Sequence, residues 1–267
     1  MKILQTFTLR TAIRLNSVLA ALLVAGCATQ HVVTANPQDP WESSNRSVYA
    51  FNDAIDRALF KPVAEAYAFV TPQPVRSCIN NIFLNLGEVW SFINSSIQGR
   101  HEDALNTMGR FLLNSTMGIG GCFDLASMNG AKRISNDFGV TLGVWGISSG
   151  PYMVLPILGG TTLRDGTGKI PDLYFNQYGY GQLVHDVEVR NSIYGFEIIE
   201  RREALLDVTN MVDRTAPDPY SFIRDAYLKK RAAQVRGTKG EAEKLPNYED
   251  FEDVPQDDKA LDMPAKK

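Results

Sequence analysis

Residues 72–99, PQPVRSCINNIFLNLGEVWSFINSSIQG, carry the apolar periodicity that decides the fold class. Their first half places six apolar residues at helical spacing: Val75, Cys78, Ile79, Ile82, Phe83 and Leu86. Gly87 interrupts this series, and a second one continues from Val89 to Ile97 before Gly99. Because glycine commonly follows the last turn of a helix, the stretch predicts two amphipathic helices that form a hairpin.

The segments on either side of this hairpin have the same period. A helix is expected from Ser43 or Ser44, either of which can cap it, to the boundary set by Pro62. Another is expected from about Glu102 to Met117, where the glycines of residues 118–121 end it. For this second helix we predict an inward face formed by Ala104, Leu105, Met108, Phe111 and Leu112.

Two more helices are predicted near the C-terminus. The first covers about residues 188–212, and the second covers 219–236, opened by Asp218 and Pro219. Residues 138–181 differ from both because ten glycines and three prolines are mixed with apolar residues. We expect an irregular apolar segment there that is interior or lines a cavity.

These segments together predict a mainly α fold, a bundle of amphipathic helices with one Gly/Pro-rich irregular apolar segment. Beyond residue 26, no stretch reaches 18 uninterrupted apolar residues, so no membrane-spanning helix is expected. The 267 residues carry a net charge of −3 and contain no dense Lys/Arg block, so nucleic acid is not an expected partner.

The N-terminus has the pattern of a lipoprotein signal peptide, assigned to residues 1–26. Basic residues precede the apolar run Val18–Ala25, which is too short to span a bilayer. Gly26 and Cys27 follow this run as in a bacterial lipobox, where the cysteine thiol receives diacylglycerol. We therefore predict that Cys27 is acylated, and that Ala28 directs the chain to the outer membrane.

The rest of the chain divides by composition. Residues 27–40 are polar and form the predicted tether, residues 41–236 form the helical domain, and residues 237–267 form an acidic tail that we expect to be disordered. Two cysteines, Cys78 and Cys122, remain beyond Cys27. In an oxidising periplasm they predict a disulfide that closes a loop of about 45 residues, with two buried free thiols as the alternative.

One pattern favours an enzyme. Residues 146–150 read G-x-S-x-G, as in a nucleophile elbow, with Ser148 as nucleophile, Asp165 or Asp172 as acid and His185 as base. Against this, no helical pattern follows Gly150 and no oxyanion loop precedes it. We therefore expect no enzyme activity and no cofactor. We also expect no metal site, because the three histidines are not spaced as ligands. Asp53, Asp56 and Arg57 are interpreted as the solvated face of a helix.

The chain resembles the MlaA family, also called VacJ, of outer-membrane lipoproteins in phospholipid transport. The resemblance covers about residues 39–228. Its motifs are Asp39-Pro40-Trp41-Glu42, Asn45-Arg46, Phe51-Asn52, Lys61-Pro62-Val63-Ala64, Pro72-Gln73-Pro74-Val75-Arg76, Asn80-Asn81-Ile82-Phe83-Leu84-Asn85-Leu86, Arg110-Phe111-Leu112-Leu113-Asn114, Gly118-Ile119-Gly120-Gly121, Phe138-Gly139-Val140-Thr141-Leu142-Gly143, Gly150-Pro151-Tyr152, Leu155-Pro156 and Leu163-Arg164-Asp165-Gly166.

This resemblance implies a ring of helices in the inner leaflet of the outer membrane, with an amphipathic channel at its centre. It implies that mislocalised phospholipids leave the outer leaflet through this channel and pass to a periplasmic phospholipid-binding protein of the Mla system, with a trimeric porin as neighbour. On the family's opening motif, Asn45, Arg46, Phe51 and Asn52 are expected to border the channel, with capping and helix packing as the alternative. A lipid hydrolase built on Ser148 and a structural envelope lipoprotein remain the other two hypotheses.

Overall fold

The computed structural model describes residues 36–183 and 185–237, without the side chains of residues 176–183. The predicted signal peptide, Cys27, most of the predicted tether and the tail from residue 238 lie outside the described residues. The helices are α2 (Glu42–Ile55), η1 (Asp56–Phe60, a π-helix), α3 (Lys61–Val70), α4 (Gln73–Ile97), α5 (His101–Thr116), α6 (Leu125–Met128), α7 (Phe138–Val144), α8 (Leu163–Leu183), α9 (Val187–Ala204), α10 (Leu206–Thr215) and α11 (Pro219–Arg236).

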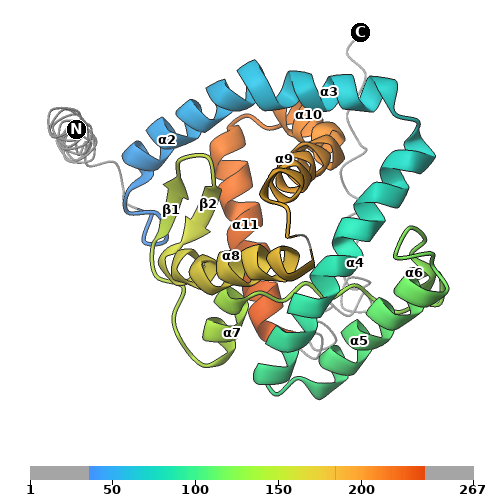
Figure 1. The fold of residues 1–267 in the computed structure, drawn as a ribbon. Coiled ribbons are helices and arrows are strands. Elements are labelled where there is room, and N and C mark those ends of the chain that lie inside the picture. The colour runs from blue at the N-terminus through green and yellow to red at the C-terminus, as the bar shows by residue number, and fades with distance from the viewer. Residues whose placement is uncertain (1–35, 184, 238–267) are drawn as a thin grey trace, which may run out of the picture.

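Figure 1 shows α2, α3, α4 and α5 following one another around the outside of the molecule, while α11 crosses its middle. The strands β1 (Tyr152–Leu155) and β2 (Gly159–Thr162) form an antiparallel hairpin beside α2. None of the described helices is long and apolar enough to cross a membrane. The mainly α fold predicted from the sequence is confirmed.

The first helix does not end at Pro62. It continues from α2 through η1 into α3, where Pro62 occupies the first turn. Proline is tolerated there because the first N–H groups of a helix have no intrahelical partner. The π-helical turn η1 connects α2 to α3 without a break. The three elements therefore run as one rod along the edge of the molecule (Figure 1).

The predicted hairpin in residues 72–99 is wrong, because α4 is one continuous helix that passes through Gly87. A mid-helix glycine costs only about 1 kcal/mol, which packing along the rest of the helix outweighs. The side chains that α4 buries are polar on both sides of Gly87: Asn85, Glu88, Ser91, Asn94 and Ser95. Glu88 bonds Arg110 of α5, whereas Ser91 donates to the Ile134 carbonyl before α7 and Asn94 Oδ1 accepts from Thr141 Oγ1 of α7 at 2.7 Å.

The inward face predicted for the next helix is wrong except at Ala104, which is buried. The helix itself is confirmed as α5, but Leu105 and Leu112 are 73% and 52% exposed. Its buried residues are Asp103, Ala104, Thr107, Arg110 and Asn114. Apart from Ala104, the buried side chains of α5 are polar, so its polar stripe faces inward.

Residues 138–181 are more regular than predicted. They form α7, the β-hairpin and most of α8, which contains Pro171 and several glycines. Asp137 caps α7 by accepting a hydrogen bond from Val140 N at 2.8 Å. A Cβ at Gly168 of α8 would lie 2.5 Å from the backbone nitrogen of Gly139 in α7, so glycine lets these two helices approach closely. The expectation that this segment is interior or lines a cavity is confirmed for the hairpin, as described below.

Near the C-terminus, α11 confirms the predicted helix over 219–236, whereas the helix predicted over 188–212 is split into α9 and α10 at Leu205. Apolar packing concentrates where α11 meets β1 and α2. Tyr152, Val154 and Tyr220 are buried there against four partly buried neighbours: Val48, Tyr49, Tyr227 and Leu228.

Ordered structure begins before Trp41, inside the predicted tether. Asp39 is buried at 1% exposure, accepts a hydrogen bond from Tyr220 Oη at 2.6 Å and pairs with Arg224 at 3.2 Å. A carboxylate is stable in such a site because both partners compensate for its lost hydration. Asp39, at the end of the predicted tether, is therefore fixed against α11.

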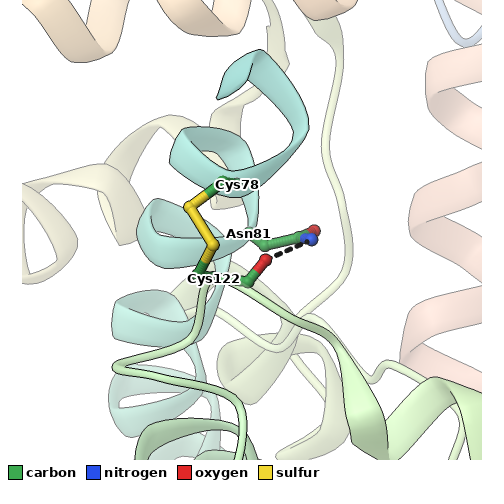
Figure 2. The surroundings of a disulfide bond; sticks show 3 residues. All are labelled: Cys78, Asn81 and Cys122. Atoms are coloured by element: carbon green, nitrogen blue, oxygen red, sulfur yellow. Dashed lines mark hydrogen bonds between the residues drawn. A yellow bond between two sulfur atoms is a disulfide. The ribbon is translucent and has the colours of Figure 1, made fainter. Parts of the chain in front are cut away.

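A disulfide joins Cys78 of α4 to Cys122, which follows the glycine turn after α5 (Figure 2). Beside it, Asn81 Nδ2 donates to the Cys122 carbonyl at 3.0 Å. The turn itself needs glycine: Gly121 has φ +94°, and a Cβ there would lie 2.8 Å from Asn85 Cβ. The disulfide and this turn together fix the end of α5 against α4.

Candidate functional site

A cavity of about 400 Å³ opens between the α2–η1–α3 rod, the β-hairpin, α10 and α11. One side of the cavity, which we call the apolar wall, consists of Val154, Val208, Val212, Phe222 and Ile223. Its charged rim consists of Asp53, Asp56, Arg57, Lys61, Arg202 and Asp213. Apolar and ionic groups thus line one space, as an amphipathic ligand requires.

The apolar wall combines buried and accessible surface. Val154 of β1 and Val212 of α10 are buried, whereas Val208 and Phe222 are about half exposed. Apolar side chains left accessible within a cavity gain free energy when hydrocarbon covers them, at about 25 cal/mol per Å². This wall is suited to holding an acyl chain.

The charged rim is organised in ion pairs. Arg57 Nε lies 2.8 Å from Asp53 and Arg57 Nη2 lies 3.3 Å from Asp213 of α10. Arg202 of α9 donates to both carboxylate oxygens of Asp56 at 2.6 and 2.8 Å. Arg57 and Asp53 are 55% and 36% exposed, as a solvated helix face predicts. The pairs with Asp213 and Arg202 also join the rod to α10 and α9 at the cavity.

The π-helix η1 lies in this rim. It carries Asp56 and Arg57, and its last backbone bond runs from Lys61 N to the Asp56 carbonyl. Single π-helical turns within α-helices are rare and are often found at functional sites. Sequence periodicity gave no sign of it, because neither proline nor glycine marks residues 56–60.

Two asparagines of α2 hold the hairpin that forms one side of the cavity. Asn45 Nδ2 donates to the Tyr152 carbonyl at 3.1 Å, and Val154 N donates to Asn45 Oδ1 at 2.9 Å. Asn52 makes the same pair of bonds three residues further along the hairpin. Its Nδ2 donates to the Leu155 carbonyl at 2.9 Å, and Ile157 N donates to its Oδ1 at 2.8 Å. Asn45 is buried and does not face the cavity, whereas Asn52 contributes to its lining.

The other two residues of the family's opening motif have different surroundings. Arg46 makes a bidentate contact with Asp218, at 3.1 and 2.6 Å, and lies over the Tyr220 ring. Its role is to hold α2 against the start of α11, and this pairing holds the pKa of Asp218 below its ordinary value. Phe51 is 53% exposed and is outside the cavity lining. Of the four expected channel residues, only Asn52 lines this cavity.

Burial also raises the pKa of Tyr152, the tyrosine of the hairpin. The pKa of Tyr152 is raised to about 12, because its buried position and then the nearby Asp39 carboxylate disfavour the phenolate. The hydroxyl is therefore neutral at any physiological pH. Tyr152 therefore contributes a neutral side chain to the lining of the cavity.

On the opposite side of the molecule, α4, α5 and α6 enclose a polar interior. Arg110 has a fully buried side chain and bonds Glu88 at 2.9 Å and Asp124 at 2.9 Å. Asn114 Nδ2 donates to the same Asp124 at 2.9 Å. Burial raises the pKa of Glu88 although Arg110 is adjacent, whereas the pKa of Asp124 is held below its ordinary value by hydrogen bonds that outweigh its burial.

Many large apolar side chains on the elements around this polar interior are exposed. They are Leu84, Ile97, Leu105, Leu112, Met117, Ile119, Phe123 and Met128. We call these eight residues the apolar outer face. Exposed large apolar side chains in such number are typical of a contact with another protein or with lipid.

The hydrolase motif does not form a nucleophile elbow. Residues 146–150 follow helix α7 and precede strand β1, which reverses the strand–turn–helix order that the elbow needs. Asp165 is engaged by Arg231 and Tyr227, both at 2.8 Å, and Asp172 by Trp90 at 2.7 Å. Ser148 and His185 share no hydrogen bond within the described residues, and both are exposed.

Comparison with known proteins gives a consistent result. The family model described as MlaA lipoprotein matches residues 37–234. The intermembrane phospholipid transport system lipoprotein MlaA of Escherichia coli (strain K12) is 33% identical over 239 residues, which cover 88% of this chain and 93% of that protein. The protein of the same name from Haemophilus influenzae is 34% identical over 238 residues, covering 86% and 93%.

A solved structure gives the same result at the level of fold. It concerns the structural basis for maintenance of bacterial outer-membrane lipid asymmetry, and it matches with a TM-score of 0.62 at 33% identity. The match covers 74% of this chain and 98% of that one. A mainly helical protein with an amphipathic cavity is the class that the fold and site define. The chain belongs to the MlaA lipoprotein family.

Proposed function

We propose that this chain is an outer-membrane lipoprotein that removes mislocalised phospholipids from the outer leaflet and so maintains lipid asymmetry. The observation that carries the proposal is the cavity, in which an apolar wall and a charged rim face one space. A phospholipid needs both, because moving its charged headgroup through hydrocarbon without polar partners is costly.

The apolar outer face supports a position within one leaflet. A body that buries Arg110, Glu88 and Asn114 while exposing leucine, isoleucine and methionine is suited to a hydrocarbon environment. Acylation of Cys27 would hold the chain at the membrane, since each buried methylene contributes about 0.8 kcal/mol. The described helices do not span a bilayer, so the chain would enter the leaflet sideways.

The further parts of the proposal follow the family resemblance. A trimeric porin beside the ring would support it laterally, and a periplasmic phospholipid-binding protein of the Mla system would accept the lipid on the periplasmic side. The names of the Escherichia coli and Haemophilus influenzae relatives place those proteins in such a transport system.

Blocking the cavity tests the proposal. Val208→Trp fills the space beside the apolar wall, and we expect cells carrying it to accumulate phospholipid in the outer leaflet and to become sensitive to detergent, as cells without the gene would. Val187→Trp is the matched control, because Val187 is equally exposed but is not part of the cavity lining. Normal outer-leaflet composition in the Val208→Trp strain, at normal protein level, would contradict the proposal.

Ser148→Ala separates transport from hydrolysis in the same assay. Because Ser148 lies in an exposed loop without a catalytic partner, the variant is expected to behave as the parent. A hydrolase would lose its activity with this serine. A strain with Ser148→Ala that resembles the deletion would favour the enzyme hypothesis.

A further inference from the structure

The cations of the charged rim are not equivalent. Arg57 is shared between two carboxylates, Asp53 and Asp213, and Arg202 is bonded to both oxygens of Asp56. Lys61 lines the same cavity but has no carboxylate within 4.0 Å among the residues that the structure describes. Its Nζ donates to Asn210 Oδ1 at 2.8 Å, a neutral partner.

This leaves Lys61 with donor capacity in the cavity. An ammonium group has three N–H donors, and the amide of Asn210 uses one. Lys61 is half-buried, so part of its charge is removed from bulk water. An anion entering the cavity would supply the charged partner that the neighbouring arginines already have.

The position of Lys61 couples this charge to the apolar wall. Lys61 lines the same cavity as the apolar wall, and its partner Asn210 belongs to α10, the helix that also carries Val208 and Val212. Lys61 also closes the last bond of the π-helix, which places it at the junction of η1 and α3. An anionic group bound here would have hydrocarbon-binding surface next to it.

We propose that Lys61 binds the phosphodiester group of a glycerophospholipid whose acyl chains lie on the apolar wall of the cavity. This inference rests on the proposed function and identifies the headgroup subsite within it. Charge complementarity selects the phosphate, because it is the anion that a glycerophospholipid carries next to its acyl chains. The ion pairs of Arg57 and Arg202 then serve to join the walls of the cavity.

The test uses the full acylated protein in detergent and measures binding of two fluorescent lipids with identical acyl chains, phosphatidylglycerol and diacylglycerol. Lys61→Gln keeps a hydrogen-bond donor but removes the charge, and it is expected to weaken phosphatidylglycerol binding about tenfold. Diacylglycerol binding should be unchanged. Lys61→Arg should restore phosphatidylglycerol binding, which shows that the loss in Lys61→Gln does not come from misfolding.

Three controls define the site. Lys230→Gln removes an exposed cation of α11 outside the cavity lining and should bind both lipids as the parent does. Raising salt should weaken phosphatidylglycerol binding of the parent more than that of Lys61→Gln. Inorganic phosphate at millimolar concentration should not displace the lipid. Displacement would reveal a general anion site and overturn the lipid assignment.

The failure of this inference is distinct from failure of the proposed function. If Val208→Trp abolishes binding of both lipids while Lys61→Gln binds phosphatidylglycerol normally, the cavity holds lipid and only the role of Lys61 is wrong. The role is equally wrong if Lys61→Gln weakens both lipids to the same extent. If the parent binds neither lipid, both the inference and the proposed function are overturned.

Discussion

The region of α4, α5 and α6 buries mostly polar side chains, whereas the region where α11 meets β1 also buries an apolar cluster. The first encloses the Glu88–Arg110–Asp124 network and turns its leucines and methionines outward. The second buries Tyr152, Val154 and Tyr220 and lies beside the cavity. An amphipathic helix can therefore bury either its polar or its apolar side, and contacts with the neighbouring elements decide which.

The largest effect is expected from breaking the polar interior. Arg110→Met leaves two carboxylates, Glu88 and Asp124, without their buried cation, and should lower the free energy of unfolding by about 3–5 kcal/mol. Denaturant unfolding in detergent measures this. Arg133→Met is the control, because Arg133 is more exposed and lies at 3.7 and 3.4 Å from the same carboxylates. Equal losses in both variants would show that Arg110 has no special role.

The disulfide should have the next largest effect. Replacing Cys78 and Cys122 together by serine opens a loop with a sequence separation of 44 residues. The expected loss of unfolding free energy is about 2–4 kcal/mol, because the unfolded chain gains conformational freedom. The same unfolding assay checks it, with the reduced parent as comparison. A double variant as stable as the oxidised parent would contradict the expectation.

A smaller effect is expected from acidification at the junction of α8 and α11. Burial raises the pKa of Asp165, but the hydrogen bond and charge of Arg231 outweigh it and hold the pKa to about 2. Because this folded value lies below the ordinary 3.8, the group contributes stability above about pH 4 and loses it as the pH falls toward 2. The contribution is roughly 2 kcal/mol.

Unfolding measured between pH 6 and pH 2 checks this pH dependence. The curve of Asp165→Asn should be flatter than that of the parent between pH 4 and pH 2. Asp207→Asn, at an exposed position of α10, should follow the parent. If the free energy of unfolding of Asp165→Asn falls with pH as steeply as that of the parent, Asp165 does not cause the acid sensitivity.

The smallest effect on stability is expected from a substitution in the apolar outer face. This substitution also tests most directly the difference between the α4–α6 region and the region where α11 meets β1. Leu105→Asn should change the free energy of unfolding in detergent by less than about 0.5 kcal/mol, because Leu105 is exposed. Binding of the chain from residue 28 onward to phosphatidylethanolamine–phosphatidylglycerol vesicles should fall about three- to tenfold. Val154→Asn, in the apolar core of the other region, should instead be strongly destabilising.

The sequence predicted the parts of the site that depend on neighbouring residues, but not those that depend on partners far away in the chain. The first helix of the domain was expected to border a passage, and Asn52 of that helix lines the cavity. Asn45 and Arg46 instead bond Tyr152 and Asp218, which are more than 100 residues away in the chain. Such partners leave no local signal, so the sequence indicated the helix but not which of its residues face the cavity.

The sequence by itself determined the helical segments, the family motifs and the pair of cysteines, because periodicity, capping residues and residue identity are local properties. Only the tertiary structure decided that α4 continues through Gly87, that η1 is π-helical and that α5 buries its polar stripe. Those outcomes depend on packing between distant segments and on the surroundings of the fold. Periodicity shows that a helix has two faces, and contacts decide which face is inside.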